Sequence, residues 1–326
     1  MPAPVRAGIT VRREWSEMEA QGRLELRGVS KQFRVAGTVL PVLREIDLAV
    51  AAGEFVAIVG ASGCGKSTLL RLIAGLDLNH GGDIVCDGAR VDGPSLERGI
   101  VFQEPRLFPW LTVKENVALG LLNASVDARA KRRAIAEHIA LVGLTGFEDA
   151  YPHQLSGGMA QRAAIARGLV ARPGLLLLDE PFGALDALTR ARLQTELQQI
   201  WARERITMLL VTHDVEEAVQ LGDRVIVFAQ RPGRIAHIVA VDVPHPRVRT
   251  DERLLRLRAE VLTLLEGTAT RPEPGAVANE RTTARDRGSD ALHGSGAATD
   301  GRDAPHHRLP CALDAAQSLD RLVGAG

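Results

Sequence analysis

A run of five apolar residues, FVAIV at 55–59, leads directly into the loop GASGCGKST at 60–68. The loop fits the pattern G-x-x-x-x-G-K-[ST], and the stretch KSTLLRLIAGL that continues it has the apolar spacing of a helix. Glycines let backbone N–H groups turn inward around a phosphate, and a helix N-terminus adds partial positive charge. A strand, this loop and a helix in that order predict an α/β fold that binds a nucleoside triphosphate.

The predicted phosphate cradle comprises nine consecutive residues. Lys66 supplies a full positive charge for the β and γ phosphates, and Ser67 is placed to ligate Mg²⁺. The complete set is Gly60, Ala61, Ser62, Gly63, Cys64, Gly65, Lys66, Ser67 and Thr68. The alternative is a glycine-rich turn that only starts a helix, and the preceding strand together with the spacing argues against it.

Strands and helices alternate along most of the chain, which predicts a three-layer α/β core with parallel strands. The run LLLLDE at 175–180 is apolar throughout, as a strand buried on both faces should be. Residues 110–170 are expected to form a mostly helical insertion, and a last helix is expected at 252–266, ending at Gly267.

Both ends of the chain differ in composition from its middle. Residues 1–22 are charged and weakly periodic, which predicts a flexible N-terminal tail before a single folded domain at 23–266. Residues 267–326 are rich in Ala, Gly, Arg, Asp and Pro, and this composition predicts a disordered C-terminal tail.

Composition argues against several classes of protein. A hydrophobic content of 45% and a charged content of 25% are typical of soluble globular proteins. The net charge is zero and basic runs are short, so no nucleic-acid partner is expected. No segment approaches the ~18 uninterrupted apolar residues of a membrane span, and the N-terminus lacks the apolar stretch of a secretion signal.

The three cysteines Cys64, Cys86 and Cys311 are odd in number and widely spaced. This argues against a disulfide framework or a metal motif and for a reducing cytoplasm. Cys64 lies inside the cradle, beside a lysine and a helix N-terminus, which favours a reactive thiol. We expect alkylation of the Cys64 thiol to inhibit hydrolysis of the nucleoside triphosphate, and we expect bound nucleotide to protect the thiol from the reagent. The alternative is a small residue that happens to fit.

Other polar residues follow apolar runs or begin helices. Asp179 and Glu180 end the buried strand, where Asp179 can lie beside the metal and Glu180 can polarise a water for attack on the γ-phosphate. Two acids after a strand are also ordinary helix-start chemistry. The segment LSGGMAQR at 155–162 predicts a second anion-binding helix end, with a simple helix cap as the alternative. His213 follows the strand MLLVT and could contact a γ-phosphate, although a lone histidine of this kind is more often structural.

The order and spacing of these motifs resemble the nucleotide-binding subunits of ATP-binding cassette (ABC) transporters, over about residues 23–265. In that family LSGG is the signature sequence and ALD at 184–186 is the D-loop. The resemblance implies a P-loop NTPase core with an antiparallel β region and an inserted helical subdomain. It also implies a head-to-tail dimer that closes on two ATP molecules.

The resemblance also implies roles for single residues. Ser156, Gly157 and Gly158 of one subunit would face the ATP held by the other. The catalytic residues would be Glu180, His213 and Lys66, and the Mg²⁺ ligands would be Ser67, Gln103 and Asp179. The ring of Phe33 would stack on adenine, where the family usually has tyrosine. Met159 stands where the signature often continues with Gln, so a polar contact there is in doubt.

The chain carries one cradle and one signature without a membrane segment, as the separate ATPase subunit of an importer does. The stretches FQEPRLFPWLTVKENVALGLL, YPHQLSGGMAQR and PFGALDALTR are similar to the nitrate, sulfonate and taurine importer branch, and most similar to aliphatic sulfonate importers. This implies permease subunits in the membrane and a periplasmic or lipid-anchored substrate-binding protein. The subunit would lie peripherally on the cytoplasmic face of the cell (inner) membrane.

The coupling surface in this family follows Gln103, and the apolar side chains of Leu107, Phe108 and Trp110 suit a permease helix there. A buried hydrophobic corner is the alternative. Nitrate and taurine are alternative cargoes. A non-transport P-loop ATPase or kinase is an alternative of a different class, and it would lack the ATP-dependent dimer.

Overall fold

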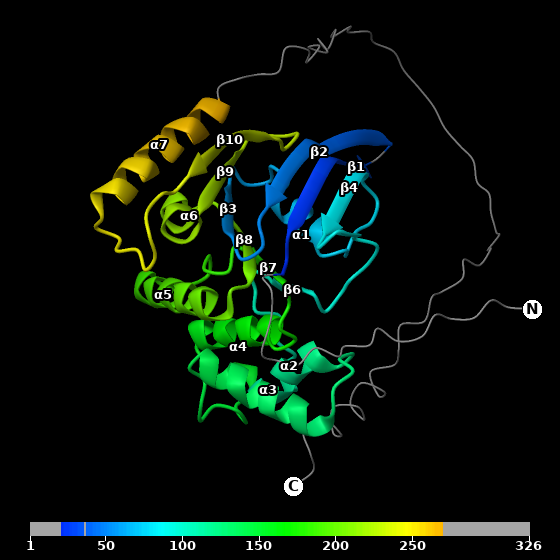
Figure 1. Cartoon of the computed structure of the whole chain (residues 1–326), viewed down its shortest axis with the longest axis vertical. Helices are drawn as coiled ribbons and strands as arrows, with labels where there is room; N and C mark the ends of the chain where they lie inside the picture. Colours follow the sequence, from blue (N-terminus) through cyan, green and yellow to red (C-terminus); the bar gives the residue numbers. More distant parts are fainter. Residues whose placement is uncertain (1–20, 36, 270–326) are drawn as a thin grey trace, which may run out of the picture.

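The computed structural model describes residues 21–35 and 37–269 of the 326-residue chain. Its strands form a six-stranded sheet in the order β10-β9-β3-β8-β7-β6 and a four-stranded sheet in the order β2-β1-β4-β5 (Figure 1). The strands are β1 (Leu24–Val35), β2 (Thr38–Val50), β3 (Phe55–Val59), β4 (Gly81–Cys86), β5 (Ala89–Arg90), β6 (Arg98–Val101), β7 (Leu175–Asp179), β8 (Thr207–Thr212), β9 (Arg224–Phe228) and β10 (Ile235–Ala240). The helices are α1 (Lys66–Ile73), α2 (Val113–Ala118), α3 (Ala128–Leu141), α4 (Gly157–Leu169), α5 (Ala187–Glu204), α6 (Val215–Leu221) and α7 (Glu252–Ala269), with 3-10 turns η1 (Leu119–Leu121) and η2 (Pro152–Gln154).

The central sheet is parallel from β9 to β6, and β10 is antiparallel at its edge. All five residues of β3 are buried, which is why FVAIV shows no alternation. Alternate residues of these strands face two separate hydrophobic cores. Leu176 and Leu178 pack with helices α4 to α7, whereas Leu175 and Leu177 pack with α1. The parallel α/β core expected from the sequence is therefore confirmed.

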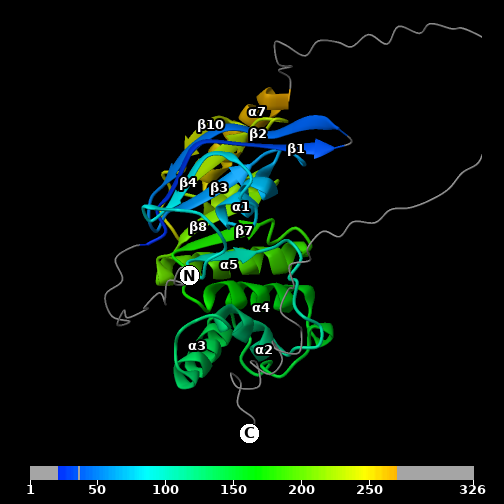
Figure 2. The same cartoon turned by 90° about the vertical axis from the view of Figure 1, so that its right-hand side faces the viewer.

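The antiparallel sheet covers the side of the core that contains α1. β1 pairs with β2 on one side and with β4 on the other. Leu24, Ile46 and Ile84 of this sheet are fully buried against the α1 core. The antiparallel β region is thereby also confirmed, and its β1–β2 hairpin extends away from the core at one end (Figure 2).

Helices α2, α3 and α4 lie together at one end of the molecule and share the hydrophobic core on that side of the central sheet (Figures 1 and 2). Polar residues fix where each helix starts. Thr112 and Glu115 form a reciprocal capping box at α2, and the side chain of Asp127 accepts a hydrogen bond from Ala130 N at α3. These helices are the inserted helical subdomain that the sequence predicts.

Two expected boundaries differ from the structure. Helix α7 runs through Gly267 to Ala269 and does not end there, because one glycine costs a helix only about 1 kcal/mol. The predicted N-terminal tail already makes contacts at its last two residues. Gln21 O accepts a hydrogen bond from Thr207 Oγ1 at 2.9 Å, and Gly22 N donates to the carboxylate of Asp87. The remaining parts of both predicted tails, 1–20 and 270–326, lie outside the described residues.

Within residues 21–35 and 37–269, no helix has the length and apolar character needed to cross a membrane.

The buried His138 of α3 is expected to make the stability of the fold dependent on pH. Its Nδ1 lies 2.8 Å from Ala134 O, and burial lowers the pKa of the imidazole below 6.5. The unfolded chain binds this proton at higher pH than the folded chain does, so stability should fall as pH drops below 6.5. We expect the thermal midpoint to decline less between pH 7 and pH 5 in His138→Gln. The exposed His153→Gln serves as control, and equal slopes in all three proteins would contradict this prediction.

Candidate functional site: an ATP-binding cassette

The loop at 60–68 arches between the end of β3 and the start of α1. Lys66 Nζ, on a side chain that is buried, donates to Gly60 O at 2.8 Å and Ala61 O at 3.0 Å. Gly65 has φ +103°, and a Cβ there would lie 2.8 Å from Leu43 Cδ2, so a side chain is excluded. Gly65 also leaves α1 without a side-chain cap. The first amides of the helix therefore remain available to an anion, which fits a phosphate.

Ser67 and Asp179 meet although 112 residues separate them in the sequence. Ser67 Oγ donates to Asp179 Oδ1 at 2.8 Å, at the point where α1 begins and β7 ends. Burial raises the pKa of the Asp179 carboxyl, so a nearby cation would offset the cost of its charge.

These two oxygen donors fit Mg²⁺, which prefers carboxylate and hydroxyl ligands. In the described part of the chain, no three His, Cys, Asp or Glu side chains are gathered into a metal site. Ser67 Oγ and Asp179 Oδ1 are side-chain oxygens that would hold a magnesium ion, which would supply positive charge beside the cradle.

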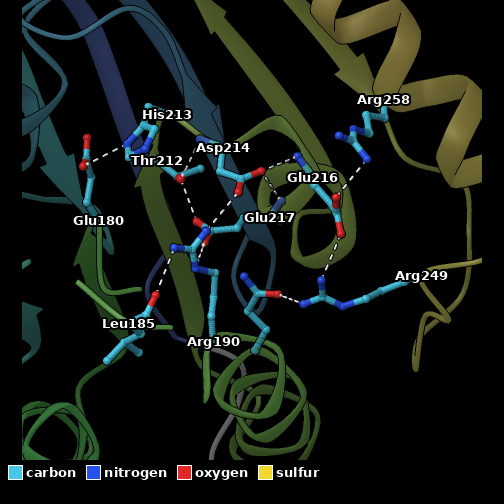
Figure 3. Close-up of polar contacts among 11 residues, drawn as sticks. Glu180, Leu185, Arg190, Thr212, His213, Asp214, Glu216, Glu217, Arg249 and Arg258 are labelled. Carbon is cyan, nitrogen blue, oxygen red and sulfur yellow. Dashed lines mark hydrogen bonds and ion pairs between the residues drawn. The ribbon is translucent and has the colours of Figure 1, made fainter. Parts of the chain in front are cut away.

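Glu180 and His213 form a direct pair at the ends of neighbouring strands (Figure 3). His213 Nδ1 lies 3.0 Å from Glu180 Oε2. The pair forms because β7 and β8 are parallel and adjacent, with Asp179 opposite Val211, so their carboxyl ends lie side by side. Glu180 has φ +45°, an uncommon conformation for a residue with a side chain, and its N–H donates to Val211 O at 2.8 Å.

Gln103 approaches the same pair from the end of β6. A Cβ built on Gly183 would lie 3.2 Å from Gln103 Nε2 and 3.7 Å from Glu180 Oε2. The structure therefore brings Gln103 and Glu180 to one place beside Gly183.

Phe33 lies on the β1–β2 hairpin that flanks the cradle. Phe33 is paired with Leu40 of β2. Three residues further along β2, the side chain of Leu43 lies against Gly65 of the cradle. Lys31 Nζ lies 4.9 Å from the centre of the Phe33 ring, and 40% of Phe33 is exposed. An exposed aromatic residue at this flank suits base stacking.

The signature residues are not brought to the cradle within one chain. Ser156 caps α4, accepting a hydrogen bond from Met159 N at 3.3 Å. Gly157 and Gly158 face α5 and the segment before it: a Cβ on Gly158 would lie 2.5 Å from Thr189 Cγ2. Met159 is partly buried against the main core.

Comparison with known proteins decides the family. The model of the ABC transporter family matches residues 43–183. An aliphatic sulfonates import ATP-binding protein of Bacillus cereus is 46% identical over 243 residues, which are 74% of this chain and 96% of that protein. Its counterpart from Bacillus licheniformis is 47% identical over 247 residues, 76% of this chain and 96% of that protein.

The chain is an ABC transporter ATP-binding protein. A solved dimeric ATP-binding cassette, in a post-hydrolysis state with ADP and Pi, matches it with a TM-score of 0.60. The two are 31% identical, and the match covers 68% of this chain and 100% of the other. The cassette fold and the use of ATP with Mg²⁺ follow from this membership.

Cys64 of this ABC ATPase differs from the expected reactive thiol. The residue is 2% exposed, and its Sγ lies 3.8 Å from Lys66 Nζ. A Cβ on Gly60 would come within 2.9 Å of that sulfur, so the thiol fills space beneath the loop. This packing favours the alternative of a small residue that fits, since reactive thiols need access to the reagent.

Two arginines near the site were not found from the sequence. Arg231 Nε donates to Gly63 O at 2.6 Å and so braces the cradle. Arg190 contacts the D-loop and the segment around His213. The sequence feature that could have pointed to Arg190 is its position four residues after the ALD motif. This feature is weak, because a charged residue near the start of a helix is ordinarily exposed to solvent.

Proposed function

We propose that this ABC ATPase energises the import of aliphatic sulfonates through a separate membrane permease. Support comes from its 44–47% identity to aliphatic sulfonate import ATP-binding proteins of several Bacillus species, each matched over 96% of its length. Sequence similarity carries this assignment of the cargo. Nitrate and taurine are the alternative cargoes.

The proposed nucleotide-binding domain covers residues 23–266, and its phosphate site is the loop 60–68. Backbone amides of Gly63, Gly65 and the first turn of α1 bind the phosphates, and Lys66 contributes the full charge. Lys66 Nζ now bonds two loop carbonyls, and these hydrogen bonds hold it at the cradle. Phe33 supplies the surface on which adenine stacks.

For hydrolysis, we assign Glu180 as the base that polarises the attacking water and His213 as the contact to the γ-phosphate. Ser67, Asp179 and Gln103 hold Mg²⁺, which neutralises phosphate charge when it is bound. The support for these roles is the convergence of the five side chains at the carboxyl edge of β6, β7 and β8. Polar groups at such an edge are suited to ligand chemistry in parallel α/β sheets.

The proposed working unit is a head-to-tail dimer. The cradle of Lys66 is at the start of α1, and the capped helix end with Ser156, Gly157 and Gly158 is at the start of α4. Pairing two chains would place that helix end at the phosphates of the partner's ATP. The dimeric state of the similar solved cassette supports this arrangement. A kinase would not form such a dimer.

The proposed permease contact lies after Gln103. Phe108 and Trp110 pack against each other with 5.3 Å between their ring centres. Phe108 is 43% exposed and Trp110 is 68% exposed. Leu107 instead packs against the core. Two exposed aromatic rings suit the burial of a short permease helix. The subunit would then lie on the cytoplasmic face of the cell membrane and meet a substrate-binding protein only through the complex.

The cargo is tested by growth of a deletion strain on single sulfur and nitrogen sources. We expect growth to fail on alkanesulfonates and to be normal on sulfate, on taurine and on nitrate as nitrogen source. Complementation by the wild-type gene should restore growth, and complementation with Glu180→Gln should not. A defect on nitrate or taurine instead would overturn the sulfonate assignment and leave the ATPase roles standing.

A further inference from the structure

Arg190, in the first turns of α5, joins two segments that flank the Glu180–His213 pair (Figure 3). Its Nη2 donates to Leu185 O, in the ALD segment, at 3.1 Å. Its Nη1 lies 3.6 Å from Asp214 Oδ2, and its Nε lies 3.9 Å from Glu217 Oε1. One guanidinium thus contacts a backbone carbonyl and two carboxylates, as its planar fork of donors permits.

The two carboxylates hold the backbone on both sides of His213. Asp214 N donates to Thr212 Oγ1 at 3.0 Å, and Thr212 Oγ1 donates to Glu217 Oε2 at 2.7 Å. Asp214 Oδ1 also accepts the amides of the first turn of α6, at 2.8 and 3.3 Å. Residues 212 and 214 are therefore fixed, and His213 projects between them with 61% of its side chain exposed.

This arrangement needs a cation. The Glu217 side chain is 6% exposed, and burial raises the pKa of its carboxyl, with a smaller contribution from the negative charge of Asp214. Arg190 is within ion-pair distance of both groups. Removing the charge of Arg190 would leave the neighbouring carboxylates of Asp214 and the buried Glu217 to repel each other next to His213.

We propose that Arg190 is a positioning residue for His213. It acts through Asp214 and Glu217, which set the backbone beside the histidine, and it ties that backbone to Leu185 of the D-loop. A displacement of the D-loop is thereby transmitted to the histidine that faces Glu180. This inference rests on the proposed function, in which His213 contacts the γ-phosphate.

The test is a double-mutant cycle on ATP hydrolysis by the full-length chain, with Arg190→Met, His213→Ala and the combined variant. We expect Arg190→Met to lower kcat by about 10²-fold, the effect of a small misplacement of a catalytic group. KM for ATP should change little, because the cradle does not contact Arg190. In the His213→Ala background, the same substitution should cost nothing further, since its effect passes through the histidine.

Arg192→Met is the matched control. Arg192 lies on the same helix, is 76% exposed and pairs with Glu196 at 3.5 Å, so kcat should stay at the wild-type value. If Arg190→Met does not fold, Arg190→Lys replaces it. The lysine keeps the charge and loses the fork, and an intermediate loss of kcat that vanishes in the His213→Ala background is expected.

Losses that multiply in the combined variant would overturn the proposal, because Arg190 would then act independently of His213. Wild-type kcat in Arg190→Met, with an impaired His213→Ala, would overturn this inference alone. Wild-type kcat in His213→Ala would overturn it together with the catalytic role of His213.

Discussion

Glu180→Gln is expected to lower the rate of ATP hydrolysis by about 10³-fold while ATP still binds. In the wild-type chain, Glu180 Oε2 lies 3.0 Å from His213 Nδ1, and an amide of the same shape can keep this hydrogen bond. The amide cannot take a proton from water. Because the cradle and the Ser67–Asp179 pair are untouched, the variant should accumulate as an ATP-bound dimer. Phosphate release measures the first effect, and size-exclusion chromatography with and without ATP measures the second.

Two variants sharpen this test. Asp179→Asn should lose Mg²⁺-dependent ATP binding as well as hydrolysis, because it removes the carboxylate that is proposed to hold Mg²⁺ together with Ser67. Glu97→Gln removes an exposed carboxylate outside the site and should behave as wild type. A Glu180→Gln protein that binds ATP and remains monomeric would contradict the dimer mechanism. Wild-type hydrolysis in that variant would contradict the role of Glu180.

The parts of the fold that could be predicted are those encoded in local pattern. β3, the phosphate loop and α1 are contiguous, and β7 is an apolar run, so each is recognised from neighbouring residues. The meeting of Ser67 with Asp179 could be anticipated because parallel strands present their carboxyl ends on one edge.

Features that depend on packing at a distance could not be predicted. The orientation of Cys64, which its sequence neighbours suggest is reactive, is set by Gly60 and the core beneath the loop. The position of Arg190 between two carboxylates depends on how α5 packs beside α6, which no spacing in the sequence encodes.

The burial of Arg247 also could not be predicted from the sequence. Replacing Arg247 should have the largest effect on the stability of the fold. In the sequence it belongs to the polar stretch VPHPRVRT and resembles a surface residue. In the structure its side chain is 1% exposed and lies 3.6 Å from Asp223. It donates hydrogen bonds of 2.7–3.1 Å to the carbonyl oxygens of Val219, Gly222, Val241 and Val243.

These contacts attach the segment after β10 to the C-terminal end of α6. Burial lowers the pKa of Arg247 to about 10, so the guanidinium remains charged at neutral pH. Arg247→Met keeps the aliphatic length and removes every donor, which leaves four carbonyl oxygens without their Arg247 hydrogen bonds and removes one of the cations near Asp223. We expect the free energy of unfolding to fall by about 3–5 kcal/mol, the cost of breaking a buried charged network. Urea unfolding followed by circular dichroism measures it.

Arg253→Met is the comparison, because Arg253 is 57% exposed and pairs with Asp251 on the surface. Its loss should cost less than about 1 kcal/mol. If both variants lose the same small amount, the Arg247 network contributes no more than a surface ion pair. A large loss confined to Arg247→Met would instead mean that α6, whose first residues flank His213, is held at its other end by a residue far from the nucleotide. The proposed catalytic histidine would then precede a seven-residue helix that Asp214 caps at its start and Arg247 holds at its end.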